Sequence, residues 1–432
     1  MTKKIICSLF AAVGGLIPLQ MFSQEDTLRK TLESIQSDIK NLKKLKISGY
    51  IQAQAQFADS NGISSFAGGS FPANTDKRFA VRRGRVKFAY NNGLSQYVMQ
   101  IDVTQGGVGI KDAYVRFTEP WAKTLHVTMG VFDRPFGFEI GYSSSSRETP
   151  ERGRMSQIIF PGERELGLML TFQRPKGTAW NFLKIDAGMF NGSGSTASDF
   201  DYFKDFIGRI RIDRTTISEK ITYGLGASFY NGGYRQPNRK VYASGTDSLG
   251  LTVFALDKDT ALFGPMPMAK RQYMGADFQL SIDWVAGITT LRAEYIQGVQ
   301  SGTSSTSTSP SAQPASDTYV RNFNGAYFYF IQNIAQSKHQ LVVKYDWYDP
   351  NTDVAGDDIG KPISGSASGL KTTGRSDLKY TTIGLGWTYR WDANLKLVLY
   401  YDMVANETSK NVSGYTKDLR DNVVTFRAQY RF

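Results

Sequence analysis

The sequence has 432 residues, of which 51 are lysine or arginine and 39 are aspartate or glutamate, so its net charge is +12. The hydrophobic fraction is 41%, and no apolar run after residue 23 reaches the roughly 20 residues that a transmembrane helix needs. The single cysteine is Cys7, which excludes disulfides, thiol catalysis and cysteine-based metal sites from the rest of the chain. The 42 glycines and 13% aromatic residues are typical of many short strands and tight turns.

Residues 1–23 have the pattern of a secretory signal peptide. Lys3 and Lys4 form a charged start, Ile5 to Leu19 form an apolar core, and Ser23 is a small residue at the expected cleavage point. The sequence therefore predicts an exported mature chain that contains no cysteine.

Residues 24–46 are polar and carry an apolar stripe with spacings of 4, 3, 4 and 3. The stripe consists of Leu28, Leu32, Ile35, Ile39 and Leu42. This spacing is an a/d heptad seam, and it predicts a short helix on the periplasmic side. Two interpretations stay open, because three heptads are marginal for an isolated helix. The segment forms a trimeric coiled coil, or it is a single amphipathic helix that rests on its own domain.

From residue 47 onward the pattern alternates with a period of two. Gln52, Gln54 and Gln56 alternate with apolar residues, and about sixteen similar segments follow. A polar face opposite an apolar face is typical of outer-membrane barrel strands, which occur in even numbers. We predict an all-β fold, a single antiparallel transmembrane barrel of about 16 strands over residues 47–432, in the outer membrane of a Gram-negative bacterium.

The ends of the predicted strands set the orientation of the barrel. Long connections such as 231–270 alternate with short turns such as 213–220, with Gln105 to Val108 as the exception. Barrels keep their short turns in the periplasm. The last segment, Val424 to Phe432, alternates and ends in phenylalanine. This ending resembles the signal that the barrel-assembly machinery recognises. The aromatic residues on lipid-face parity are predicted to form membrane-boundary girdles; they are Tyr295, Trp347, Trp387, Tyr389 and Tyr401.

Cations cluster on the predicted inner face of several strands. Within the segment Arg78 to Tyr90, every second side chain from Arg83 to Lys87 is cationic, and the opposite face from Gly84 to Tyr90 carries no charge and is mostly apolar. Arg82 has the wrong parity for the lumen unless the strand bulges, and Arg292 is expected to be neutralised by Glu294. The predicted pore-lining, anion-binding residues are Arg83, Arg85, Lys87, Arg116, Arg209 and Arg211.

The long connection from Pro135 to Glu163 is the predicted constriction loop. Its candidate residues, with the one at its exit, are Arg147, Arg152, Arg154 and Arg164. Glu139, Glu148 and Glu151 lie in the same segment. Two roles stay open for each arginine, namely direct contact with an anion and an ion pair that braces the loop against the wall.

Five stretches carry a resemblance to a known family. They are Gly49 to Gln52 (GYIQ), Val81 to Arg85 (VRRGR), Met129 to Phe132 (MGVF), Pro135 to Gly137 (PFG) and Phe160 to Gly167 (FPGERELG). The sequence resembles the phosphate-selective porin O and P family. The resemblance implies a sixteen-stranded trimeric barrel, loops folded into the pore and a ladder of arginines that leads phosphate inward.

The function predicted from the sequence is a water-filled, anion-selective channel for phosphate or polyphosphate. The alternatives are a general diffusion porin with weak anion preference, and an outer-membrane enzyme or adhesin barrel. The two histidines, His126 and His339, have no evident serine and aspartate partners, so no enzyme, metal or cofactor is expected. The expected partners are inorganic phosphate or other small anions, membrane lipid, the assembly machinery and further copies of the chain in a homotrimer, with no nucleic acid.

Overall fold

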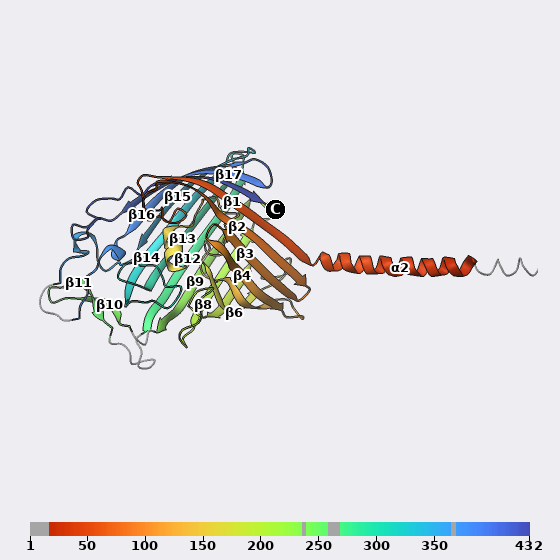
Figure 1. Ribbon diagram of the computed structural model, residues 1–432, viewed down its shortest axis with the longest axis horizontal. Helices are drawn as coiled ribbons and strands as arrows, with labels where there is room; N and C mark the ends of the chain where they lie inside the picture. The colour runs from red at the N-terminus through yellow and green to blue at the C-terminus, as the bar shows by residue number, and fades with distance from the viewer. Residues whose placement is uncertain (1–16, 236–238, 258–267, 364–368) are drawn as a thin grey trace, which may run out of the picture.

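The computed structural model describes residues 17–235, 239–257, 268–363 and 369–432 (Figure 1). Among them, one closed β-barrel is joined to a helix that projects away from it. Most of the predicted signal peptide, residues 1–16, lies outside the described residues. Its cleavage therefore stays a prediction.

Sixteen antiparallel strands form the barrel in the described part of the chain. Each strand pairs with its neighbour in sequence, β9 pairs with β12 across the intervening segment, and β18 pairs with β1 to close the ring. This confirms the predicted fold and strand number. The barrel strands are β1 Leu45–Ala58, β2 Lys77–Asn92, β3 Ser95–Thr104, β4 Gly107–Thr118, β5 Leu125–Asp133, β6 Arg164–Gln173, β7 Leu183–Phe190, β8 Asp205–Thr215, β9 Ile221–Arg235, β12 Met268–Trp284, β13 Gly287–Gly302, β14 Thr318–Asn333, β15 His339–Asp349, β16 Tyr380–Arg390, β17 Leu395–Asn406 and β18 Val423–Arg431.

The connection between β9 and β12 contains a hairpin that the sequence prediction treated as loop. Its strands are β10 Val241–Thr246 and β11 Thr252–Leu256, and β10 also runs parallel to the start of β14. The Tyr242 ring stacks on that of Tyr319, with 5.2 Å between ring centroids. The two strands are too short to show a clear alternation, so the hairpin depends on this contact with a distant strand. Short 3-10 turns lie at Gly356–Asp358 and Arg375–Asp377.

Side-chain exposure follows the predicted parity. On β1, Gln52, Gln54 and Gln56 are at most 5% exposed, whereas Ile51 and Phe57 are 51% and 47% exposed. Alternating side chains of a strand point to opposite faces, so the glutamines face the lumen and the apolar residues face outward. Large apolar side chains are exposed in the same way on the other barrel strands. An apolar outer surface of this kind is the surface of a membrane-spanning barrel.

Two β-bulges interrupt the parity and bring extra cations inward. On β2 the pairing shifts from Gln52 with Arg83 to Ala53 with Val81, so Arg82 is the additional residue. The bulge turns Arg82 toward the lumen beside Arg83. Strand alternation without a bulge would have placed Arg82 on the lipid face. On β4 the partners change from Gln100 with Asp112 to Ile101 with Ile110. Lys111 is the additional residue there.

The N-terminal helix, α2 Ile17–Leu42, leads directly toward β1 (Figure 1). Its apolar stripe is open to solvent, since the five stripe residues are 46–68% exposed. The alternative in which this helix rests on its own domain is therefore wrong for the described chain. None of the described helices combines the length and apolarity needed to cross a membrane.

Candidate functional site

The connection between β5 and β6, residues 134–163, folds into the barrel lumen and carries a short helix, α3 Arg154–Ile159. Its side chains Phe136, Ile159 and Phe160 are at most 1% exposed and pack in one core with Tyr273 and Tyr327 of β12 and β14. Each such fully buried side chain contributes about 1.5–3 kcal/mol. Apolar burial therefore holds this segment, here called the lumen loop, against one wall of the barrel.

Polar contacts fasten the start of the lumen loop to the same wall. The Glu294 carboxylate on β13 accepts hydrogen bonds from the backbone N–H groups of Phe138 and Glu139, at 3.0 and 3.1 Å. Gly137 has a φ of +58° and lies so close to Glu294 that a Cβ would meet the carboxylate, so only glycine fits. Glu294 therefore binds the loop backbone. The expectation that it neutralises Arg292 is wrong.

Arg292 instead pairs with Glu148 of the lumen loop, with 2.7 Å between Nη1 and Oε2. Its guanidinium also lies over the Tyr142 ring, 4.5 Å from the centroid. Sequence reasoning chose the carboxylate two residues away on the same strand. The loop carboxylate lies closer in space, although it is 144 residues distant in the chain.

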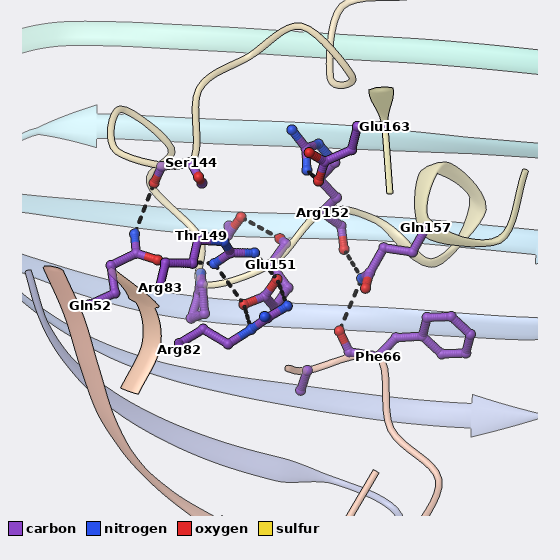
Figure 2. A network of polar contacts seen from close by, with 12 residues as sticks. Gln52, Phe66, Arg82, Arg83, Ser144, Thr149, Glu151, Arg152, Gln157 and Glu163 are labelled. Carbon is purple, nitrogen blue, oxygen red and sulfur yellow. Dashed lines mark hydrogen bonds and ion pairs between the residues drawn. The ribbon is translucent and has the colours of Figure 1, made fainter. Parts of the chain in front are cut away.

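A carboxylate at the centre of the lumen loop is held by three arginines of the opposite wall, two of which, Arg82 and Arg83, are labelled in Figure 2. Glu151 pairs with Arg82 at 2.9 Å, Arg83 at 2.7 Å and Arg427 at 2.9 Å. Burial alone would raise the pKa of the Glu151 carboxyl, but the three guanidinium groups hold that pKa well below its usual range. Glu151 is therefore a charged tie between the loop and strands β2 and β18.

The predicted residue Arg83 does face the lumen, but it is not open to an anion. Its guanidinium donates both to Glu151 and to the Gln52 side chain, and the residue is 4% exposed. Breaking a buried pair of this kind leaves an uncompensated charge, which is strongly destabilising. Arg83 was predicted to bind anions, but its contacts fit the bracing role that the sequence left open only for the loop arginines.

A cavity of about 730 Å³ lies between the lumen loop and strands β1–β4, toward the short-turn end of the barrel. We call this cavity the cationic vestibule. Ser143, Ser144 and Ser145 of the loop form part of its surface. Its charged lining consists of six basic residues, Lys46, Arg85, Lys87, Arg152, Arg164 and Arg431, against two acidic residues, Asp112 and Asp133. The charge around this water-accessible space is predominantly positive.

The predicted strand residues differ in their positions. Arg85 lines the vestibule and pairs with Asp102 at 2.9 Å, and Lys87 lines it with no ion pair among the described residues. Arg116 faces the lumen on β4 and donates to Thr128 at 3.1 Å. Two further predicted residues of β8 do not line the vestibule. Of these, Arg209 pairs with Asp277 at 2.9 Å and Arg211 pairs with Asp213 at 2.6 Å.

The predicted loop arginines also differ in what their guanidinium groups contact. Arg152 pairs with Glu163, and Arg164 pairs with Asp112 at 2.9 Å, while both line the vestibule. The Arg154 guanidinium lies 3.8 Å from the centroid of the Tyr380 ring and 4.6 Å from that of Phe66. These contacts hold the lumen loop against its neighbours.

Arg147 differs from the other loop arginines. It is 3% exposed, and its three guanidinium nitrogens have no hydrogen-bond partner among the described residues. Burial and the neighbouring Arg83 guanidinium lower the pKa of Arg147. The nearby Lys396 ammonium donates to the Arg147 backbone carbonyl at 2.9 Å. Arg147 is therefore a buried donor group with unused hydrogen-bonding capacity.

Sequence reasoning missed Lys111, because only the bulge in β4 brings it inward. It interacts electrostatically with Arg85, Arg164 and Asp102. No ion pair is found for Lys111 in the described part of the chain. Lys87, Lys111 and Arg116 are lumen-facing cations of β2 and β4 that form no ion pair among the described residues. We call these three residues the free cations.

The comparisons with known proteins give structural neighbours only. No family model and no curated protein matches the sequence, so the resemblance to the phosphate-selective porin O and P family stays a prediction. One similar solved structure is an anion-selective porin from Comamonas acidovorans, at 11% identity over 90% of this chain and 99% of that one, with a TM-score of 0.49. Another is the outer-membrane channel DcaP of Acinetobacter baumannii, at 13% identity over 90% of this chain and 97% of that one, with a TM-score of 0.49. A loop-deletion mutant of OmpT, an outer-membrane protein of Vibrio cholerae, matches at 9% identity over 90% and 99% of the two chains, with a TM-score of 0.49.

Proposed function

We propose that the protein is an outer-membrane porin that carries small anions, phosphate among them, through the barrel lumen. The observation that supports this most is the cationic vestibule, with six basic and two acidic lining residues. A cleft lined by one sign of charge and bounded by low-dielectric walls raises the local concentration of the opposite ion. The vestibule therefore favours anions over cations of the same size.

The lumen cations divide into positioning residues and residues available to the anion. Arg82, Arg83 and Arg427 hold Glu151 and so fix the lumen loop. The free cations attract anions along β2 and β4, while the Arg147 guanidinium is unpaired but enclosed within the loop. A guanidinium offers a fixed fork of donors that matches two oxygens of one oxyanion. We therefore assign anion attraction to the free cations, of which Arg116 carries such a fork.

Transport requires that an ion binds well enough to enter and weakly enough to leave. Most lumen arginines are already paired with carboxylates, which weakens their hold on a passing anion. Several weak positive sites along β2 and β4 meet the requirement better than one fully unpaired arginine cluster. The paired arginines thus keep the electrostatic field positive without forming a deep trap.

Planar-bilayer recording tests this proposal. In a potassium chloride gradient we expect a reversal potential on the anion-selective side, and millimolar phosphate should reduce the chloride current. A general diffusion porin with weak anion preference would show the first effect without the second. A cation-selective channel, or a protein that forms no channel, would contradict the proposal.

We further propose that the protein is a homotrimer joined through α2. The exposed stripe repeats at heptad spacing, which is the pattern of a self-associating helix. In that heptad register Asp38 lies at a g position and Lys43 at the following e position, where parallel neighbours form complementary pairs. All barrels insert in the same orientation, so their helices extend in parallel and in register.

A further inference from the structure

A groove lies on the outer, lipid-facing wall of the barrel, away from the lumen. It has a volume of about 550 Å³ and crosses strands β9, β12, β13 and β14 toward the long-loop end. Phe229, Met274 and Val299 form its apolar part. Phe229 and Met274 are 42% and 61% exposed. These side chains face outward by parity, so the apolar part of the groove opens to membrane hydrocarbon.

Five amide side chains line the polar part of the same groove. They are Asn231, Gln272, Gln297, Asn322 and Asn324. Strand register places them side by side, because Gln272 is opposite Asn231 and Gln297 is opposite Asn324. The Gln272 amide donates to the Asn231 side chain at 3.0 Å. An amide offers two donors and an acceptor with two lone pairs, so these internal contacts leave most of the hydrogen-bonding capacity of the row unused.

Aromatic residues mark the level of the groove in the membrane. The Trp347 indole donates to Asn324 at 3.0 Å, and the Tyr295 hydroxyl donates to Gln297 at 3.0 Å. Both rings belong to the predicted girdle, and amphipathic aromatic rings sit where hydrocarbon meets headgroups. Gln297 lies opposite Met274 and Val299 lies opposite Gln272, so amide and apolar side chains are interleaved in the groove, next to these rings. The groove fits an amphiphile at the boundary between hydrocarbon and headgroups.

We propose that this groove binds a saccharide-headed lipid of the outer leaflet. None of its lining residues in the described chain is charged, although the Asn322 amide of the groove donates to the Asp353 carboxylate at 2.9 Å. A phosphate or carboxylate head would call for cationic donors, as in the lumen. Amide side chains both donate and accept hydrogen bonds. The neighbouring hydroxyl groups of a saccharide also donate and accept, so the two kinds of group are matched. The long-loop end is the extracellular end of such barrels, so the lipid is drawn from the outer leaflet.

Native mass spectrometry of the purified full chain tests the proposal. The barrel is equilibrated in mixed micelles with glucosyl-diacylglycerol and phosphatidylglycerol of identical acyl chains. We expect the glucosyl lipid to be retained about tenfold more strongly than phosphatidylglycerol. The triple variant Asn231→Ala, Gln272→Ala, Gln297→Ala should lose this preference.

The matched control removes an amide pair elsewhere. Gln96 donates to Asn91 at 2.8 Å at the short-turn end of the barrel, and the variant Asn91→Ala, Gln96→Ala should keep the lipid preference. Equal retention of both lipids by the unmodified protein, or an unchanged preference in the triple variant, would overturn the proposal. Gln297→Cys in a Cys7→Ser background gives a further test. Disulfide-linked dimers formed in the membrane would show that a second copy covers the groove instead.

Discussion

The two sides of the lumen have opposite chemistry. On the β1–β4 side lie the free cations Lys87, Lys111 and Arg116, and Lys87 lines the water-accessible cationic vestibule. On the β12–β15 side, tyrosines such as Tyr273 and Tyr327 are 1% exposed and pack against the lumen loop. The difference shows that one long loop has two tasks. It completes an apolar core with one wall and leaves a positively charged passage along the other.

The boundary between the two sides is the charged tie at Glu151. Its three arginines belong to β2 and β18, on the side of the vestibule, while Phe136, Ile159 and Phe160 of the loop pack on the apolar side. The tie therefore keeps the loop from swinging fully toward the tyrosine wall or into the vestibule. The following predictions test this division of the lumen.

We expect the largest effect from Glu151→Ala. It leaves the buried guanidinium groups of Arg83 and Arg427, and the partly exposed one of Arg82, without their carboxylate. This should cost about 3–5 kcal/mol and loosen the loop. The melting temperature of the detergent-solubilised barrel should fall, and single-channel recordings should become noisy and more conductive. Glu148→Ala removes the partner of Arg292 alone and serves as the milder control. An unchanged melting temperature for Glu151→Ala would show that the cluster does not hold the loop.

The same tie predicts an acid sensitivity. The pKa of Glu151 is lowered in the folded protein, so its contribution to stability is present above the unfolded carboxyl pKa of about 4.3. That contribution is lost as the pH falls through the lower folded-state value. The melting temperature should therefore drop below about pH 4, and the drop should be smaller in Glu151→Gln. Equal acid profiles for the two proteins would argue against the assignment.

On the apolar side, Ile159→Ala should destabilise the loop by about 2–4 kcal/mol, because it leaves a cavity in a packed core. Its effect on ion selectivity should be absent, since Ile159 does not line the vestibule. Urea unfolding and reversal potentials measured on the same preparation check both parts. A change of selectivity without loss of stability would indicate that ions pass on the apolar side of the loop, which would contradict the assigned ion path.

The smallest effect on the channel itself is expected from α2. Ile35→Asp with Ile39→Asp introduces charge into the exposed stripe, which should lower the trimer fraction in light scattering and leave single-channel selectivity unchanged. Ser34→Asp with Ser37→Asp adds the same charge outside the stripe and should leave assembly intact. If both double variants assemble equally well, α2 is not the element that joins the copies.

The sequence was sufficient for the features that repeat along each strand. Alternation alone placed the glutamines of β1 and the cations of β2 on the inner face, and it predicted a barrel of about sixteen strands. It could not show a bulge, because one additional residue in a strand has no signature in composition. Arg82 and Lys111 consequently reach the lumen against simple parity. The β10–β11 hairpin was missed for a related reason, since its strands are short and pair with a distant element.

Sequence reasoning also could not predict which lumen residues form ion pairs with each other. Glu151 lies 68 residues from Arg83 and 276 residues from Arg427, so nothing local indicates that they meet. Sequence reasoning therefore identified lumen-facing arginines but could not separate those that hold the loop from those that remain available. The separation depends on where one loop folds inside the barrel.

Reversal potentials of two matched variants test the division of the lumen most directly. Replacement of the free cations in the triple variant Lys87→Gln, Lys111→Gln, Arg116→Gln should abolish most of the anion preference in a potassium chloride gradient. The control Arg209→Gln, Arg211→Gln removes two arginines that are paired with Asp277 and Asp213 and should leave the preference nearly intact. Loss of selectivity in the control with retention in the triple variant would contradict the assignment of the anion path to the β1–β4 side.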